Sequence, residues 1–299
     1  MELYHLRTFV KVADTGNLTR ASEALFTSQP AISGHIKALE DELGLRLFSR
    51  SAKGMSLTPA GKSLYAQAQA TLDAAQAFKF AAQALKNELV GELKVGVHTD
   101  FDFVRTGHLY ANMHARHPKV PVHFLQGSSY ITNGQLRDGQ IDIGFMFGEN
   151  HANDVEMYLV EEVPMAIVAP AKWADKIEGA DLAKLAQQPW VYTSSSCPFF
   201  VLMESVFSDC PVKVRQHAWV DSEDAVRQLV KSGVGLSVLR LDDAQRMAAL
   251  GEVAIWEGDV PSIPMSIATL KRRKGEPVID AFKQLVFETW QIDQVAASA

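Results

Sequence analysis

Apolar residues recur at helical spacing in the stretch 27–44, where polar residues occupy most of the remaining positions. The apolar members that fall on one helical face are Ile32, Ile36, Leu39 and Leu43. This spacing predicts an amphipathic helix that packs on one side. Ser28 can cap its first turn, Pro30 is tolerated there because that N–H has no helical partner, and Gly44 can end the helix.

The opposite face of this helix carries small hydrogen-bonding side chains near its N-terminal end. Its polar members are Gln29, Ser33, His35 and Lys37. Such a face suits contacts with base edges in a major groove, as in a recognition helix. An ordinary amphipathic surface helix is the alternative interpretation, since such helices are common in globular proteins.

A helix with apolar positions from Leu3 to Ala13 is expected before it. That helix should end near Gly16, and Asn17 can cap a short second helix. Two helices joined by a tight turn to the stretch 27–44 predict a helix-turn-helix.

Two short alternating segments, LRLFSR and MSLT, flank residues 51–54 and predict a hairpin or wing. Arg50 and Lys53 lie on it. Basic side chains on a wing would contact phosphates and fix the position of the protein on DNA. A solvated turn is the alternative.

A longer helical pattern begins at Pro59 and continues to Leu89. At 1.5 Å per residue it would be about 45 Å long, too long for a small domain to cover. Apolar residues recur along it at nearly the 3.5-residue period of paired helices, at Leu64, Ala68, Leu72, Ala75, Phe78, Ala82, Leu85 and Leu89. The pattern predicts dimerisation through Leu64, Leu72, Phe78 and Leu85. A low-complexity linker is the alternative, although Ala and Gln favour helix.

From Gly91 onward, strands alternate with helices. Strands are expected at 92–97, 120–125 and 141–147, and helices at 105–117 and 130–137. This alternation predicts a parallel α/β sheet. A second lobe is expected from strands at 163–170, 189–193, 213–219 and 235–241 and helices at 199–207 and 222–231. A strand at 264–270 and a helix at 278–290 close the chain and could return to the first lobe, which the pattern alone does not decide.

The length of 299 residues suits two or three domains. The sequence has no run of 18 apolar residues and no secretory signal, so we expect a cytoplasmic protein that does not contact a membrane. Cys197 and Cys210 are too few for a disulfide framework and agree with a reducing compartment.

The net charge of −6 argues at first against nucleic acid. Residues 1–60, however, carry seven basic and six acidic side chains, so the acidic excess lies in the remainder of the chain. The charge therefore does not exclude DNA binding by the first part. Because the basic excess there is slight, tight binding would need two or more copies that pool their phosphate contacts.

The residues SQPAISGHIKALEDELGLRLFSR at 28–50, LTPAG at 57–61 and the preceding pattern L-x-x-F-V-x-V-A-x-T-G-x-L-T-x-A-S-x-x-L resemble LysR-type transcriptional regulators. The resemblance implies an α+β winged helix-turn-helix DNA-binding domain at 1–58 and a long linker helix at 59–89 that dimerises. It also implies an α/β two-lobed effector domain similar to periplasmic binding proteins. The first lobe would comprise 90–162 and 264–299, and the second 163–263.

By position, the resemblance places Gln29, Pro30 and Ser33 at the groove-facing end of the recognition helix, with Thr27 and Ser28 near the DNA backbone. The predicted DNA-binding set is completed by His35, Lys37, Arg50 and Lys53. Two residues depart from the family pattern. Gly34 stands where a longer, often basic side chain is usual, which costs roughly 1 kcal/mol of helix propensity relative to Ala. His35 stands where Gln is common, and we expect it to be a neutral hydrogen-bonding histidine.

In a two-lobed α/β protein the ligand lies in the crevice at the carboxyl ends of the strands. The loops just past the predicted strands hold the candidates Thr99, Asp100, Ser128, Ser129, Phe147, Thr193, Ser194, Ser195 and Ser196. The serine run precedes a helix, so its hydroxyl and N–H groups could bind a carboxylate, or it could simply cap that helix. Asp100 and Asp102 would repel a bare anion unless Arg105 offsets them, so an amino acid or another effector of mixed charge stays open.

Oxidation is the alternative to a ligand. A thiol at a helix N-terminus, as expected for Cys197, can have a lowered pKa, and Cys210 is 13 residues away. Peroxide-sensing relatives use a cysteine pair in the second lobe. Buried, inert thiols are the plainer interpretation.

Catalytic motifs are absent from the sequence, which has no G-x-S-x-G, H-E-x-x-H or phosphate loop. Gly233-Val234-Gly235 follows a predicted helix and reads as its C-cap, and His114 and His117 have no further ligand at metal-binding spacing. No enzyme activity, cofactor or metal is therefore predicted.

We thus expect a DNA-binding transcription regulator controlled by a small-molecule effector. Its expected partners are a double-stranded DNA operator, the effector, a second copy in a homodimer or homotetramer, and RNA polymerase if it is an activator.

Overall fold

The computed structural model describes residues 1–299 apart from 52–53, 85–88, 90, 98 and 293–299, and it leaves out the side chains of 50–51, 76–77, 79–81 and 83–84. Lys53 and Leu85, predicted for the wing and the dimer seam, lie outside the described residues, as does the side chain of Arg50. The chain forms two units, residues 1–88 and 89–299.

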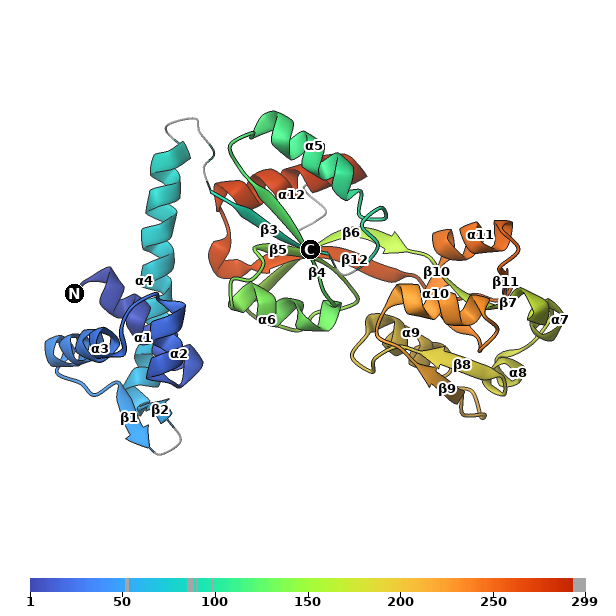
Figure 1. Cartoon of the computed structure of the whole chain (residues 1–299), viewed down its shortest axis with the longest axis horizontal. Coiled ribbons are helices and arrows are strands. Elements are labelled where there is room, and N and C mark those ends of the chain that lie inside the picture. Colours follow the sequence, from blue (N-terminus) through green and yellow to red (C-terminus); the bar gives the residue numbers. More distant parts are fainter. Residues whose placement is uncertain (52–53, 85–88, 90, 98, 293–299) are drawn as a thin grey trace. The chain divides into compact units, whose positions relative to one another are not determined.

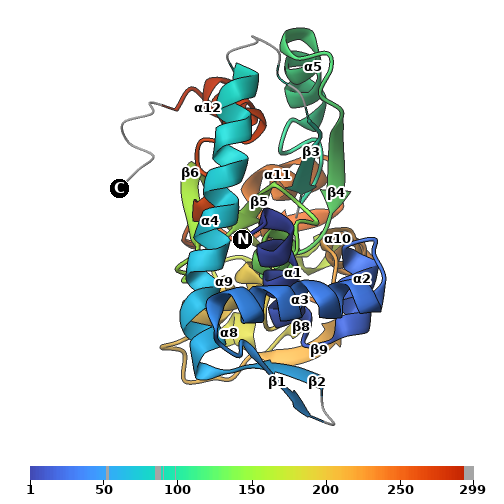
Figure 2. The same ribbon diagram turned by 90° about the vertical axis from the view of Figure 1, so that its left-hand side faces the viewer.

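The first unit is a three-helix domain followed by a two-stranded wing and a long helix (Figures 1 and 2). Its elements are α1 (Leu3–Thr15), α2 (Leu18–Ala24), α3 (Gln29–Leu43), β1 (Phe48–Ser51), β2 (Gly54–Leu57) and α4 (Pro59–Ala84). The side chains of Asn17 and Ser28 cap α2 and α3 by accepting N–H groups of the first turn. Gly16 and Gly44 end α1 and α3 in the left-handed conformation that glycine adopts without strain. The predicted helix-turn-helix and its caps are confirmed.

The core of this unit is formed by the faces predicted from the apolar spacing, except at their ends, where Leu3 and Leu43 are 43% and 39% exposed. Its fully buried members include Phe9, Val12, Ile32, Leu39 and Leu47. Helix α4 packs onto this core through Leu64 and Leu72, with Ala68 buried between them. Leu64 and Leu72, in the first half of the predicted dimer seam, therefore already contact residues of their own chain. Phe78, in the second half, is 76% exposed.

The predicted extension of this helix to Leu89 is wrong. Helix α4 is described to Ala84, and Leu89 is not helical. The side chain of Leu89 packs instead against the core of the second unit, where its apolar surface is partly removed from water.

The second unit has two lobes, and the first contains a five-stranded sheet with the order β4-β3-β5-β12-β6. Its strands are β3 (Leu93–Val97), β4 (Val122–Gln126), β5 (Ile143–Phe147), β6 (Val155–Val163) and β12 (Ile263–Leu270). Its helices are α5 (Thr106–Arg116), η1 (Ser129–Ile131), α6 (Thr132–Arg137), η3 (Lys271–Arg273) and α12 (Pro277–Trp290). Figure 1 shows α5 and α12 side by side on one face of the sheet and α6 on the other.

Strands β4, β3 and β5 are parallel, as predicted, but β12 is antiparallel to both of its neighbours. It returns from the second lobe in the opposite direction, which the prediction for the first three strands did not cover. The return of the last strand and helix to the first lobe is confirmed. Strand β6 was not predicted. It lies at the sheet edge and carries Glu156, Glu161 and Glu162, which interrupt its apolar alternation.

The second lobe contains an antiparallel sheet with the order β10-β7-β11 and a parallel pair, β8 and β9. Its strands are β7 (Met165–Pro170), β8 (Pro189–Tyr192), β9 (Arg215–Trp219), β10 (Ser237–Arg240) and β11 (Val253–Ile255). Its helices are η2 (Ala171–Trp173), α7 (Ala174–Ile177), α8 (Leu182–Ala186), α9 (Pro198–Val206), α10 (Glu223–Lys231) and α11 (Leu241–Ala249). The short elements α7, α8 and β11 and the helix α11 were not predicted.

At Gly235 the backbone that leads into β10 passes close to the backbone of β8, which connects the three-stranded sheet to the parallel pair. A Cβ at this position would meet the carbonyl oxygen of Pro189 at 2.5 Å. The neighbouring Leu236 donates its N–H to that same oxygen at 2.9 Å and forms a parallel bridge with Trp190. The chain thus needs a glycine here to place β10 beside β8.

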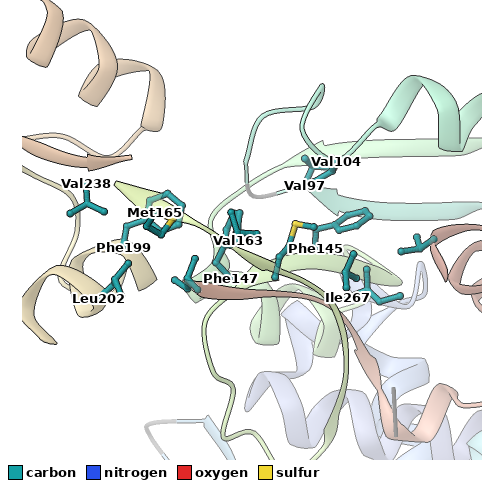
Figure 3. Packing of buried hydrophobic residues seen from close by; sticks show 14 of the residues in the cluster. Val97, Val104, Phe145, Phe147, Val163, Met165, Phe199, Leu202, Val238 and Ile267 are labelled. Atoms are coloured by element: carbon teal, nitrogen blue, oxygen red, sulfur yellow. The ribbon is translucent and has the colours of Figure 1, made fainter. Parts of the chain in front are cut away.

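One apolar core continues through the point where the chain crosses between the lobes. Figure 3 shows Val163 and Met165 at the crossing, with Phe145 and Ile267 on the side of the first lobe and Phe199 on the side of the second. All five are buried. The two lobes therefore share one hydrophobic core at the crossing.

Candidate functional site

The first unit exposes the N-terminal end of α3. The predicted contacts Thr27, Ser28, Gln29, Pro30 and Lys37 are all exposed, and Ser33 is half-buried. Ser33 and Lys37 line an open groove of about 510 Å³ that also includes Met55 of the wing. Helix α3 and the wing therefore present one continuous surface.

Glu40 fixes the wing to α3, a role that was not predicted. Its side chain is 7% exposed, and Oε1 accepts the backbone N–H groups of Leu47 at 2.7 Å and Phe48 at 3.1 Å. Oε2 pairs with Nη1 of Arg46 at 3.1 Å. These N–H groups lie where the chain enters β1, so one carboxylate holds the end of the recognition helix to the start of the wing.

His35 lies against α1 rather than fully in the open. Its Nδ1 is 3.0 Å from Oγ1 of Thr8, and that hydroxyl already donates to the carbonyl of Tyr4 at 2.9 Å. Nδ1 is therefore the donor in the contact with Thr8. Burial and the neighbouring His5 lower the pKa of His35, in agreement with the expected neutral histidine. A contact between His35 and DNA stays a prediction.

Gly34→Ala is expected to raise the free energy of unfolding by about 0.5–1 kcal/mol. Gly34 is exposed within α3, and a Cβ there would meet nothing within 4 Å. Alanine would therefore gain helix propensity without a clash. Far-UV circular dichroism during urea unfolding would measure the change. Gly61→Ala is the control, because its Cβ would meet the carbonyl oxygen of Leu47 at 2.2 Å and must destabilise the protein. Destabilisation by both variants would contradict this account of Gly34.

The second unit contains a cleft of about 420 Å³ between its lobes. Its lining includes six predicted effector residues, Thr99, Asp100, Ser128, Ser129, Phe147 and Thr193. They lie at or just after the carboxyl ends of β3, β4, β5 and β8. Ser129 Oγ accepts the N–H of Phe147 at 3.2 Å, which ties two of these loops together.

The serine run behaves differently from its prediction. Ser194, Ser195 and Ser196 are not among the described residues that line the cleft, and the last two are exposed. The residue that caps α9 is Cys197, whose N–H donates to the carbonyl oxygen of Ser194 at 2.7 Å. The Oγ of Ser194 also accepts the N–H of Ser196 at 3.4 Å, so this turn is closed on itself. No serine side chain caps α9, and an effector contact by the three serines stays a prediction.

Arg105 does not offset the acidic residues beside the cleft. Its guanidinium stacks over the ring of Trp290 at 4.6 Å and donates to the carbonyl oxygen of Thr289 at 2.8 Å. Both partners belong to α12. The possibility that Arg105 offsets Asp100 and Asp102 is therefore not supported, since its guanidinium contacts α12 instead.

A buried guanidinium connects the lobes, and sequence reasoning missed it. Arg240, at the end of β10, is 2% exposed. Its Nη1 donates to Thr99 Oγ1 of the first lobe at 2.6 Å, and its Cζ lies 4.0 Å from the ring centre of Phe103. Its Nη2 donates to Asp243 at 2.9 Å. The residues that meet here are far apart in the chain, so a local pattern does not reveal them.

Asp243, at the start of α11, holds this group in place. It is 2% exposed, and its Oδ2 accepts from Nη1 of Arg227 at 2.7 Å as well as from Arg240. Its Oδ1 pairs with Arg246. One carboxylate therefore compensates two largely buried guanidinium groups.

Glu223, at the start of α10, lines the cleft beside this network. Thr99 Oγ1 donates to its Oε2 at 3.2 Å, and Nη1 of Arg240 lies 3.5 Å from the same oxygen. Burial raises the pKa of Glu223 to about 7, although Arg240 and Arg227 oppose the shift. The Thr99 hydroxyl of the first lobe thus accepts a hydrogen bond from Arg240 and donates one to Glu223, and both of these residues belong to the second lobe.

Both cysteines are free and half-buried. Cys197 lines the cleft, and Cys210 packs against the apolar core. These positions do not favour oxidation over a ligand.

Within the described part of the chain, no three His, Cys, Asp or Glu side chains lie close enough together to hold a metal ion. Across the same residues, no helix has the length and apolar character needed to span a membrane.

Two family models match most of the chain. Residues 3–62 match the bacterial regulatory helix-turn-helix protein family of the lysR type, and residues 86–291 match the LysR substrate binding domain. The chain is 29% identical over 236 residues to the HTH-type transcriptional regulator CysL of Bacillus subtilis, which covers 78% of this chain and 79% of that protein.

Solved structures show the same architecture. Full-length OxyR from Pseudomonas aeruginosa is 28% identical with a TM-score of 0.68, over 100% of this chain and 97% of that one. Full-length CbnR in complex with its target DNA is 23% identical with a TM-score of 0.53, over 97% of this chain and 100% of that one, and is evidence for the fold alone. The chain therefore belongs to the LysR family and is a DNA-binding transcription regulator with an effector-binding domain.

Proposed function

We propose that this regulator binds a double-stranded DNA operator as a homodimer or homotetramer, and that a small-molecule effector in the cleft controls it. Helix α3 would enter the major groove while the wing contacts the backbone. RNA polymerase would be a further partner if the regulator activates transcription.

The observation that carries the effector role is the cleft itself. Both lobes line it, and its wall combines aromatic rings, hydroxyl groups and carboxylates. Small-molecule sites are concave and mostly apolar, with a few polar groups that fix the ligand. Because Thr99 and Glu223 belong to different lobes and both line the cleft, a ligand there would contact the groups that join the lobes.

The exposed part of α4 supports the proposed dimer. Phe78 lies on the seam with 76% of its side chain exposed, whereas Leu64 and Leu72 already pack within the chain. We therefore assign the dimer contact mainly to the second half of α4. Sedimentation of Phe78→Asp would test it, with a shift toward monomer as the expected result and an unchanged dimer as the contradicting one.

Gln29→Ala or Ser33→Ala is expected to loosen discrimination among DNA sites, whereas Arg50→Ala should weaken binding to all sites alike. Loss of a base contact costs about 1–3 kcal/mol at one position, while a lost phosphate contact acts on every sequence. Fluorescence anisotropy with a duplex selected from a random library, and with a scrambled duplex, would measure both. Equal losses on the two duplexes in all three variants would contradict these roles.

A thermal-shift screen of the full chain tests the cleft. A ligand at 100 times its dissociation constant should add about 2.7 kcal/mol to the free energy of unfolding. Organic acids, amino acids, amines and aromatic acids form the panel, with a peroxide-treated sample beside them. A shift that Ser129→Ala weakens supports the cleft, and a shift only on oxidation that Cys197→Ala removes would replace the effector by a thiol switch.

A further inference from the structure

Carboxylates dominate the charged lining of the cleft. The acidic members of the described lining are Asp100, Asp102, Asp221, Glu223 and Asp224, and the basic member is Arg227. The acids come from the loop after β3 in one lobe and from the start of α10 in the other. The cavity therefore presents negative charge from both sides.

The guanidinium groups at the cleft already have carboxylate partners. Arg227 is 13% exposed and contacts Asp243 at 2.7 Å, Glu223 at 3.8 Å and also Asp224. Arg240 lies behind the lining, where it pairs with Asp243 at 2.9 Å. An anionic ligand would have to displace these contacts. It would also meet Asp100, Asp102 and Asp221, which form no ion pair with the part of the chain that the structure describes.

Aromatic rings form the apolar part of the wall. Phe147 from the first lobe and Phe199 from the second have ring centres 5.1 Å apart at an interplanar angle of 59°. Both line the cleft, together with Phe101 and Tyr130. The faces of aromatic rings attract cations and also bury apolar groups. A cavity with such walls and a surplus of carboxylates is complementary to a positively charged group on an apolar body.

We propose that the effector is an organic cation, a primary amine or guanidine on an apolar or aromatic body, whose charge lies near Glu223 and Asp221 and whose body lies against Phe147 and Phe199. This inference rests on the proposed function, because it assigns a chemical class to the ligand of the same cleft. It narrows the mixed-charge alternative raised by Asp100 and Asp102 to a ligand with a net positive charge.

Matched ligand pairs test the class directly. Each pair has one skeleton and either an amine or a carboxylate: phenethylamine with 3-phenylpropanoate, tryptamine with indole-3-propanoate, and isopentylamine with 4-methylpentanoate. Titration calorimetry with the full chain is expected to give at least tenfold tighter binding of the amine in one pair or more. Tighter or equal binding of every acid overturns the proposal, as does the failure of all three amines to bind at millimolar concentration.

Proton linkage provides a second readout. A cation favours the ionised form of Glu223, so amine binding should release protons and strengthen as the pH rises from about one unit below 7 to one unit above it. The groups that face Glu223 are Arg227 from α10, Arg240 from β10, Asp243 from α11 and the Thr99 hydroxyl. An anion would reverse the sign, because it favours the protonated carboxyl. Proton uptake on binding therefore overturns the proposal.

Variants separate this inference from the proposed function. Glu223→Gln is expected to weaken amine binding tenfold or more and to remove its pH dependence, while Glu257→Gln, an exposed acid outside the lining, should change neither. Asp221→Asn is the second test and should also weaken amine binding. Its carboxylate is exposed, so the substitution leaves the buried network of Arg227, Arg240 and Asp243 intact. If an acid binds and Ser129→Ala weakens its binding, the cleft is supported as the effector site, but the proposal that the effector is a cation is overturned. If amines bind without any effect of these substitutions, the cleft assignment itself is wrong.

Discussion

Asp243→Ala is expected to lower the free energy of unfolding of the second unit by about 3–5 kcal/mol, the usual effect of removing one partner from a buried ion pair. Asp243 is 2% exposed and accepts from Arg227 at 2.7 Å and from Arg240 at 2.9 Å. Without it, two largely buried guanidinium groups keep their charge and lose the closest acceptor that they share, while Glu223 lies farther away at 3.5 and 3.8 Å.

The measurement is thermal unfolding of the full chain followed by tryptophan fluorescence. All five tryptophans lie beyond residue 89, so this signal reports on the second unit. A domain of this size loses about 2–4 °C of melting temperature per kcal/mol, so a decrease of about 6–20 °C is expected.

Asp242→Ala is the matched control. Asp242 contacts the same Arg240 at 3.1 Å, but it is 54% exposed. Exposed ion pairs contribute about 0–1 kcal/mol, so this variant should melt within a few degrees of the parent. If Asp242→Ala destabilised the unit as strongly as Asp243→Ala, burial would not explain the effect of Asp243.

The bridge between the lobes connects this stability to regulation. Arg240 donates to Thr99 at 2.6 Å, and Thr99 donates to Glu223 at 3.2 Å, so one hydroxyl of the first lobe is held by two charged groups of the second. A ligand that forms an ion pair or hydrogen bond with Glu223 would change the surroundings of Thr99, because Thr99 donates to the same carboxylate. We therefore expect a ligand in the cleft to act on the contact between the lobes through Thr99, and a conformational change would follow if the ligand binds one arrangement of the lobes more tightly than another.

The sequence predicted correctly those features that depend on residues close together in the chain. The caps at Asn17 and Ser28, the stops at Gly16 and Gly44 and the apolar face of α3 all depend on neighbouring residues, and all are present. The resemblance to a known family then supplied the return of β12 to the first lobe, which no periodicity could reveal.

The misses have long-range causes. Arg240 and Asp243 received no role from the sequence, because their partners Thr99 and Arg227 are distant in the chain and only the fold brings them together. The serine run looked like an anion site because the direction of a turn cannot be judged from its composition, and Ser195 and Ser196 in fact face solvent. The candidates at strand ends, such as Thr99 and Ser129, line the cleft because strand polarity alone determines where those loops gather.

Glu40→Ala is expected to lower the free energy of unfolding of the first unit by about 2–4 kcal/mol, because two backbone N–H groups lose their shared acceptor in a buried place. Those groups are the N–H of Leu47 at 2.7 Å and of Phe48 at 3.1 Å. The first unit contains no tryptophan, so far-UV circular dichroism should show a destabilised helical transition while tryptophan fluorescence keeps its midpoint.

The same variant should also weaken DNA binding at temperatures where the unit is still folded. Glu40 holds the end of α3 to the start of β1, and a wing that is no longer fixed must be ordered again on each binding event. Both the selected and the scrambled duplex should be affected, since a wing contacts the backbone. Asp41→Ala, a change at the exposed neighbouring carboxylate, is the control and should leave stability and affinity nearly unchanged. Full affinity in a stable Glu40→Ala protein would mean that the wing is positioned by its packing against the core and not by this carboxylate.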